Sequence, residues 1–257
     1  MGGWPHASIL FFLYIGVLSL SFAGIDRRKR TLALIGSTIG LVITTVSQGW
    51  PNAVLNGWIV PPALLLVAYW TSGLLYRAPM LRAERMLCRF DQRLHIRPIA
   101  AAAPRLLAEL LEFAYVAVYP IVPVALIVHV ATSKTPDPAR FWTVILLTDF
   151  VCFGMLPWVQ TRPPRTLHQQ PPWNARFRAV NLRLLGKTSI QVNTFPSGHA
   201  AEAFAALLLV LDAPPLLVAW MLVNALAISA GAALGQYHFA ADVLAGWAVA
   251  LVVWLLV

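Results

Sequence analysis

Charged residues, acidic residues and cysteines are all scarce in this sequence. Only 11% of its 257 residues are charged, against roughly 25% in soluble domains, and its mean hydropathy is +0.72. This shortage of charge argues against a soluble globular protein and favours a membrane protein built as one compact helical bundle. The two cysteines, Cys88 and Cys152, lie far apart in the sequence, which argues against a paired metal or redox motif.

The small number of acidic residues leaves the chain with a formal net charge of +9. Nucleic acid would balance such a charge, but the basic residues occupy short loops between apolar runs, where membrane proteins concentrate them. We therefore expect membrane lipids as partners and no nucleic acid. The sequence leaves the oligomeric state unknown.

No basic residue precedes the first apolar run, residues 7–24, whereas residues 27–30 are Arg-Arg-Lys-Arg. A cleaved signal peptide has the opposite order of charge. We therefore expect this run to be a retained membrane helix.

Eight apolar runs approach the length of about 20 residues that a helix needs to span a bilayer. They predict an all-α, polytopic membrane helical bundle with about six core spanning helices and about two N-terminal ones. Because two of the runs are short, six or seven spans are alternatives to eight. The runs cover residues 7–24, 31–47, 58–76, 106–131, 141–159, 197–212, 215–236 and 239–257.

Residues 77–105 contain many arginines against only two acidic residues, Glu84 and Asp91. The pattern predicts a basic helix with one apolar stripe, lying in the lipid headgroup layer. A solvated connecting loop is the alternative. The stripe follows steps of three and four residues through Met80, Ala83, Leu87, Phe90 and Leu94.

The segment 160–196 contains no acidic residue, and the pairs Pro163-Pro164 and Pro171-Pro172 interrupt regular structure in it. Its unbalanced charge requires an anion, either a bound phosphate or the anionic headgroups at the membrane face. The basic residues are Arg162, Arg165, Arg176, Arg178, Arg183 and Lys187.

The tetrapeptide Pro196-Ser197-Gly198-His199 stands at the start of an apolar run. Proline is favoured in the first turn of a helix, and Asn193 or Thr194 is placed to cap it. Gly198 lets an anion approach the free N–H groups at the positive end of the helix dipole. His199 is placed to give a proton to a leaving oxygen. The alternative is a helix cap followed by an interfacial histidine.

His238 and Asp242 are four residues apart, which places them on one helix face. Asp242 is the only charged residue in 239–257, and an unpaired carboxylate there would be costly, so it requires a partner. A hydrogen bond from one ring nitrogen of His238 to this carboxylate would leave the other nitrogen free to attack. A purely structural pair is the alternative.

If the last three runs all span, His199 and His238 emerge on the same side of the membrane as the 160–196 segment. Two histidines, a carboxylate and several arginines are suited to attack on phosphorus through a phosphohistidine, with cations holding the equatorial oxygens. This chemistry needs no metal and no other cofactor, and the sequence contains no compact cluster of metal ligands.

These motifs resemble those of the type 2 phosphatidic acid phosphatase superfamily of membrane enzymes. That family carries a basic motif ending in Arg-Pro, a Pro-Ser-Gly-His and a final His-x-x-x-Asp. Arg162-Pro163, residues 196–199 and His238 with Asp242 match in that order, within a similarity that spans roughly 106–257. The neighbouring residues look like the branch that includes inositol phosphorylceramide synthases: Asn193 to His199, Gln236 to His238, Gly246, Glu112, Tyr115 and Tyr119.

The resemblance implies that His238 is the nucleophile, that Asp242 orients it, and that His199 is the general acid and then the base. It divides the chain into N-terminal membrane helices, 1–57, and a phosphatidic acid phosphatase-like catalytic membrane domain, 58–257. It assigns phosphate binding to Arg162, Arg165, Ser197 and Gly198.

Two cations that are customary in the family are absent. Its lysine, seven residues before the Arg-Pro, corresponds to Met155, and its Ser-Arg before the last histidine corresponds to Gly231-Ala232. Arg165 is the favoured substitute because it lies nearest the helix end, and the other candidates are Arg176, Arg178 and Arg183. Without a substitute, the site would bind lipid phosphate and not turn it over.

The charge rule and the resemblance disagree about sidedness. With eight spans, the basic loops at 25–30 and 77–105 share a side with the candidate site and are cytoplasmic by the charge rule. The resemblance places that site on the outer face. We follow the resemblance, because catalytic arginines distort the charge count. We expect a multi-pass protein of a bacterial inner membrane with its active site facing the periplasm.

The leading hypothesis is an integral membrane lipid-phosphate phosphatase or phosphotransferase that acts through a phosphohistidine on a lipid phosphate. Water as the acceptor makes it a phosphatase. A second alcohol makes it a headgroup transferase, such as an inositol phosphorylceramide synthase-like enzyme. The alternative from a different class is a non-catalytic membrane protein that binds lipid phosphate.

Overall fold

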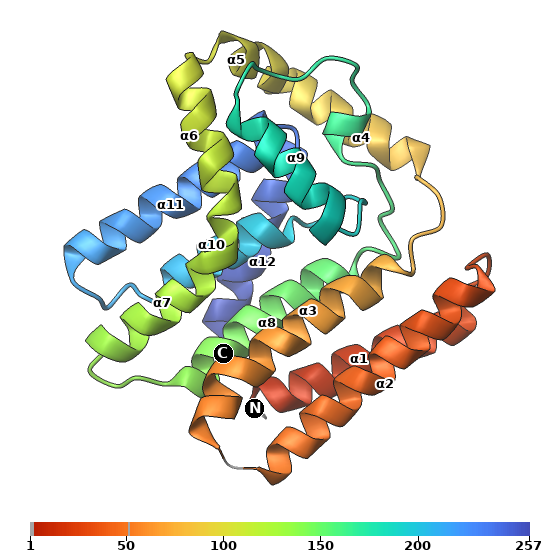
Figure 1. Cartoon of the computed structure of the whole chain (residues 1–257), viewed down its shortest axis with the longest axis vertical. Coiled ribbons are helices and arrows are strands. Elements are labelled where there is room, and N and C mark those ends of the chain that lie inside the picture. Colours follow the sequence, from red (N-terminus) through yellow and green to blue (C-terminus); the bar gives the residue numbers. More distant parts are fainter. Residues whose placement is uncertain (1–2, 51) are drawn as a thin grey trace.

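The computed structural model describes residues 3–50 and 52–257, and these residues fold almost entirely into helices (Figure 1). The only strand-like pairing among them is a single antiparallel bridge between Thr161 and Asn193. The predicted all-α class is therefore confirmed. The helices are α1 Trp4–Ser21, α2 Arg27–Gly49, η1 Leu55–Ile59, α3 Val60–Gly73, α4 Leu81–Arg93, α5 Ile96–Ala102, α6 Arg105–Val116, α7 Val118–Thr132, α8 Pro138–Gly154, η2 Pro164–Thr166, α9 Phe177–Thr188, α10 Gly198–Leu208, α11 Pro215–Leu234 and α12 Ala240–Leu256.

The N-terminal helices pack side by side along one edge of the molecule (Figure 1). α1 contacts α2 and α8, and α2 and α8 both contact α3. α2 begins earlier than the apolar run 31–47 predicts. The reason is Asp26, whose side chain accepts hydrogen bonds from the N–H groups of Arg28 and Lys29 at 3.0 and 3.2 Å and so caps the helix.

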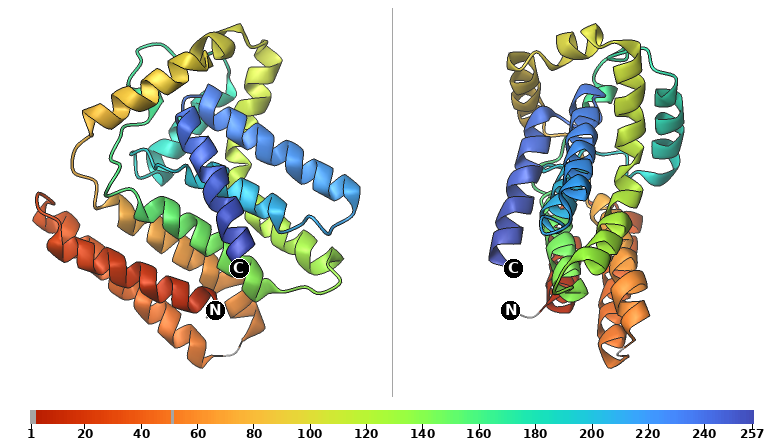
Figure 2. Two further views of the ribbon diagram at one scale, coloured as in Figure 1. Left: turned by 180° about the vertical axis from the view of Figure 1, so that it is seen from behind. Right: turned by 90° about the vertical axis from the view of Figure 1, so that its left-hand side faces the viewer.

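α10 lies at the centre of the bundle, in contact with α7, α8, α11 and α12 (Figure 2). It has 11 residues and is therefore only about 16 Å long, well short of the about 30 Å of a hydrocarbon core. The chain turns at Asp212, whose carboxylate accepts a hydrogen bond from Ser133 at 2.6 Å. The run 197–212 is thus an enclosed core helix, not a full span.

Among the described residues, three helices, α1, α2 and α11, are long and apolar enough to cross a membrane, and α6 with α7 would add a fourth span with a 65° bend. Many of their large apolar side chains point outward, among them Val17, Ile39, Leu216 and Val223. A water-soluble monomer rarely exposes so much apolar surface. This outer surface is suited to lipid.

The predicted basic helix over 77–105 is two helices, α4 and α5, which run across one end of the bundle (Figures 1 and 2). They are separated at His95, which adopts a left-handed conformation with φ of 53°. The predicted stripe is divided as well. Leu87 is buried and Phe90 packs against the protein, whereas Met80 and Leu94 are exposed. The reason is that α4 packs on α12, so part of its apolar face is covered by protein.

Candidate active site

The structure brings the two motif histidines together inside the bundle. His199 lies in the first turn of α10, and His238 lies in the short loop that connects α11 to α12. The centroids of their rings are 5.9 Å apart. Nε2 of His199 and Nδ1 of His238 are buried and have no hydrogen-bond partner within the described residues. Buried polar atoms without partners are rare in folded proteins. Nε2 of His199 is therefore available to bind a ligand, whereas Nδ1 of His238 faces the Asp242 carboxylate.

Asp242 stands behind His238, as the four-residue spacing predicts. Its Oδ2 atom is 3.5 Å from Nδ1 of His238, which is longer than a well-formed hydrogen bond. The same oxygen accepts shorter bonds, both 2.9 Å, from the Asn193 side-chain amide and from the Phe239 N–H. Asp242 is therefore held mainly by Asn193 and by the start of α12, and the His–Asp pair is close but not tightly bonded.

Aromatic rings form a stack that ends at His199. Tyr115 lies parallel to the His199 ring with 5.4 Å between centroids, and Tyr237 lies parallel to Tyr115 at 4.0 Å. Tyr119 approaches His199 edge-on at 6.1 Å. Tyr115 and Tyr119 come from α6 and α7, on either side of the bend between these helices. The bent pair of helices therefore positions one face of the imidazole.

Glu112 anchors this stack through a buried hydrogen-bond network. Its carboxylate accepts bonds from the Trp173 indole at 2.7 Å, the Arg178 guanidinium at 2.9 Å, the Asn181 amide at 2.6 Å and the Tyr237 hydroxyl. The ion pair to Arg178 balances the charge of a completely buried carboxylate. Arg178 is therefore occupied by Glu112 and does not supply a free cation.

Arg165 is the predicted phosphate-binding arginine that reaches the histidines. Its backbone N–H donates to the Gln236 carbonyl at 2.8 Å, and its guanidinium lies 3.5 Å from the Tyr237 carbonyl. Within the described residues no carboxylate lies within salt-bridge distance of it. Burial lowers the pKa of Arg165, whereas the nearby Tyr115 hydroxyl acts in the opposite direction. A partly buried cation without a carboxylate partner is suited to bind an anion.

Arg162 lies elsewhere. Its guanidinium makes a two-pronged ion pair with Glu84 of α4, with N···O distances of 3.0 and 2.8 Å, and its backbone N–H binds the same carboxylate. Hydrogen bonds from Arg162 lower the pKa of Glu84. Arg162 therefore joins the 160–166 segment to α4, and the structure does not bring it to the histidines as the motif implies.

Ser197 and Gly198 start α10. The Ser197 hydroxyl accepts from the Ala200 N–H at 3.4 Å, so Ser197 caps the helix and not Asn193 or Thr194. The reason is that the Asn193 amide already binds Asp242 and Thr161. At Gly198 a Cβ would meet the Phe153 ring at 2.9 Å. Gly198 thus allows close packing of α10 on α8.

The structure shows what surrounds the positions at which the two customary cations are missing. At Gly231 a Cβ would lie 2.5 Å from the Leu111 carbonyl oxygen, because α11 and α6 pack closely there. Ala232 is completely buried against Tyr115 and Tyr237. A long basic side chain does not fit at either position. Met155, at the end of α8, is partly exposed.

A small cavity of about 20 Å³ lies between the histidines. It can hold one water molecule but not a phosphoryl group with its oxygens. Arg165 also lines a second, larger groove of about 840 Å³. The lining residues of the small cavity include Tyr69, Tyr115, Arg165, Ser189, Val192, Thr194, His199, Tyr237 and His238.

Tyr69, Asn193 as the partner of Asp242, and Glu84 as the partner of Arg162 were not predicted. The only signal for Glu84 was its isolation among arginines. Tyr69 lies in an apolar run with nothing to distinguish it. Among the described residues, no three His, Cys, Asp or Glu side chains are grouped as a metal site would require.

The fold and the site define a polytopic helical membrane protein with a buried two-histidine site and an unpaired arginine. A family model for the PAP2 superfamily matches residues 85–256, and the chain belongs to this superfamily. Membership supports an integral membrane protein with a lipid phosphatase- or phosphotransferase-type function. No curated protein and no solved structure matches the chain.

Proposed function

We propose that this protein transfers the phosphoryl group of a lipid phosphate ester through a phosphohistidine at His238. The observation that carries the proposal is the shared cavity of His238, His199 and Arg165, with the Asp242 carboxylate 3.5 Å behind His238. A nucleophile, a proton donor and a cation on one small cavity are the groups that phosphoryl transfer requires.

In the first step, a ring nitrogen of His238 attacks phosphorus. The P–N bond forms while the P–O bond to the leaving alcohol breaks, and protonated His199 gives its proton to the leaving oxygen. In the second step, the hydroxyl of an acceptor attacks phosphorus. A P–O bond forms, the P–N bond breaks, and His199 takes the proton back. Arg165 stabilises the negative oxygens in both transition states.

The acceptor is water in a phosphatase and an alcohol in a transferase. One observation favours an alcohol, as in the inositol phosphorylceramide synthase-like branch. The groove beside Arg165 is lined by several amide side chains, which suit a hydroxylated acceptor because amides both donate and accept hydrogen bonds. These are Gln169, Gln170, Asn174 and Gln236.

The direct test is product analysis with a panel of lipid phosphates, each offered with and without a soluble alcohol acceptor. A phosphatase releases inorganic phosphate at a rate that the alcohol does not change. A transferase forms a new phosphate ester at the expense of phosphate release. If purified, folded protein binds the lipids and yields neither product, it is a non-catalytic lipid-phosphate binder.

We further propose that the protein lies in a bacterial inner membrane with this site on the periplasmic face and with α4 in the headgroup layer. The contacts that support a common face are those of α4 with the 160–166 segment, through Glu84 and Arg162, and with α12, through Asp91 and the Ala240 N–H at 2.9 Å. Single cysteines at positions 89 and 176 should label from the same side. Labelling from opposite sides would contradict this topology.

A further inference from the structure

The segment between α9 and α10 forms the outer wall of the histidine cavity. Ser189, Val192 and Thr194 of this segment line the cavity, and residues 189–197 are not helical. Because the cavity of about 20 Å³ is too small for a phosphoryl group, the site has to open before a lipid phosphate reaches His238. A non-helical wall is the part of the enclosure with the fewest backbone bonds to break.

α3 holds this wall closed at two points. The Tyr69 hydroxyl accepts a hydrogen bond from the Ile190 N–H at 3.1 Å. One turn further along α3, Ile190 fills the space above Gly73, where a Cβ would lie only 2.6 Å from the Ile190 side chain. Residues 69 and 73 share a face of the helix. Just before the wall, at the end of α9, the Thr188 hydroxyl lies 3.5 Å from the hydroxyl of Tyr119 of α7, which is a long contact.

Tyr69 also belongs to the cavity itself. It is one of the lining residues, and its ring packs edge-on against Phe153 at 5.4 Å. α3 precedes residue 85, where the match to the PAP2 superfamily begins. A part of the chain outside the matched region thus contributes a side chain to the site.

We propose that Tyr69 is a positioning residue that holds the 189–192 wall closed over His199 and His238. The closed wall excludes bulk water from the phosphohistidine, so that the phosphoryl group goes to an alcohol in preference to water. The first statement rests on the contacts of Tyr69, whereas the second rests on the function proposed above.

The first test measures closure without any chemistry. Val192 is replaced by cysteine in a background with Cys88→Ser and Cys152→Ser, and the rate of labelling by a soluble maleimide is measured. Tyr69→Phe keeps the ring and removes only the acceptor of the Ile190 N–H. We expect labelling to become about fivefold faster, as expected for the loss of one hydrogen bond. Gly73→Ala should increase the rate as well, because it displaces Ile190.

Tyr14→Phe is the matched control. Its hydroxyl bonds to the Gly154 carbonyl and to the Trp158 indole, away from the wall, so it should leave the labelling rate unchanged. If Tyr69→Phe elutes as a folded protein and labels at the original rate, Tyr69 does not hold the wall, and the proposal is overturned. The same conclusion follows if Tyr14→Phe accelerates labelling equally.

The second test measures how product divides between water and an added alcohol. In Tyr69→Phe the ratio of hydrolysis to transfer should rise several-fold. An unchanged ratio would overturn the role in water exclusion. If His238→Ala still turns over, the proposed function fails, but faster labelling in Tyr69→Phe would still show that Tyr69 closes the wall.

Discussion

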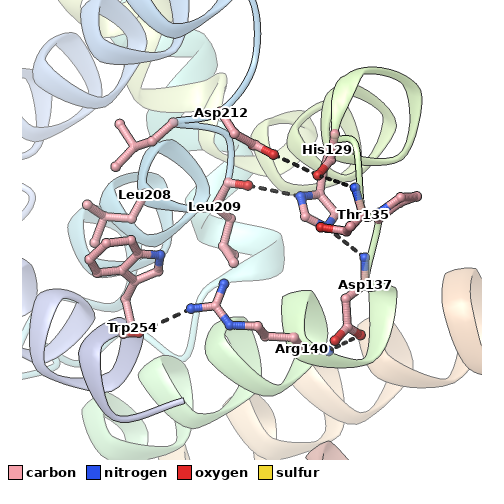
Figure 3. A pocket seen from close by; sticks show the side chains of 11 residues that line it. His129, Thr135, Asp137, Arg140, Leu208, Leu209, Asp212 and Trp254 are labelled. Atoms are coloured by element: carbon pink, nitrogen blue, oxygen red, sulfur yellow. Dashed lines mark hydrogen bonds between the residues drawn. The ribbon is translucent and has the colours of Figure 1, made fainter.

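Histidines lie at both ends of α10, His129 of α7 at the C-terminal end and His199 with His238 at the N-terminal end, and their surroundings differ. At the C-terminal end, Nδ1 of His129 lies 3.0 Å from the Leu209 carbonyl, and its Nε2 accepts from the Asp137 N–H at 3.1 Å (Figure 3). Arg140 there bonds to the Trp254 carbonyl at 3.4 Å. At the N-terminal end, His199 and His238 each leave a ring nitrogen without a partner in the described part of the chain.

Of the two cavities that these histidines line, the larger is not the candidate active site. The cavity beside His129 has a volume of about 610 Å³, whereas the one between His199 and His238 has about 20 Å³. The polar groups around His129 bond to one another and tie α7, α8, α10 and α12 together (Figure 3). Satisfied polar groups stabilise a fold, and unsatisfied ones are available for chemistry. Hydrogen-bond satisfaction therefore distinguishes the candidate active site from a structural junction.

The most direct test of this difference is to replace one histidine at each end of α10. His238→Ala should lower the turnover number by at least about 10⁴-fold, because no other group replaces a nucleophile. His129→Ala should keep activity per folded molecule. It leaves the Leu209 carbonyl and the Asp137 N–H unpaired, at about 1–3 kcal/mol each, so it should lower the thermal stability. Loss of turnover in both variants at equal folding would contradict the comparison.

A second prediction separates the two histidines of the active end. His199→Ala should lower the turnover number about 10²- to 10⁴-fold on an alkyl phosphate, because the leaving oxygen then lacks its proton donor. On an aryl phosphate with a good leaving group, most of that loss in the first step should disappear. The comparison requires initial-burst rates on both substrates. Equal loss on both would assign His199 a role other than proton donation.

A third prediction compares Arg162, which belongs to the Arg-Pro motif, with Arg165, which follows that motif. Arg165→Ala should lower kcat/KM by about 30- to 1,000-fold, or about 2–4 kcal/mol of transition-state stabilisation. Arg162→Ala should cost less than about tenfold, because Arg162 is paired with Glu84 of α4 and does not line the histidine cavity. Arg27→Ala, in the distant loop, is the control for surface charge. An Arg162 effect larger than the Arg165 effect would reverse our assignment.

The smallest expected effect is that of a chelator. The proposed mechanism places all cationic assistance on arginine, so EDTA should leave the rate within about twofold of its original value. The measurement is a steady-state rate after dialysis against EDTA. Complete loss, restored by a divalent cation, would replace the phosphohistidine mechanism with a metal-assisted one.

The proximity of His199 and His238 could be predicted from the sequence, because successive helices that run in opposite directions bring both residues to the same end of the bundle. The prediction assumed that residues 197–212 span the membrane, and α10 is too short for that. The conclusion holds nonetheless, because α11 returns the chain and α12 packs beside α10. Asp242 could be placed near His238 from the four-residue spacing, although His238 lies in the loop before α12 and not on the helix itself.

The remaining contacts of the site could not be predicted, because they join segments that no local pattern relates. Arg162 and Glu84 are 78 residues apart in the sequence, and Ile190 and Tyr69 are 121 apart. The motif itself includes Arg162, and Arg165 was favoured as the substitute for a missing cation. Only the packing of α4 against the 160–166 segment shows that Arg162 is neutralised by a carboxylate and that Arg165 is not.

The central claim is a covalent phosphohistidine at His238, and rapid acid-free quenching with a ³²P-labelled lipid phosphate tests it most directly. The account predicts a phosphoenzyme that is labile to acid and stable to base. It should be absent in His238→Ala and present in His129→Ala. A phosphoenzyme that survives acid, or one that persists in folded His238→Ala, would contradict it.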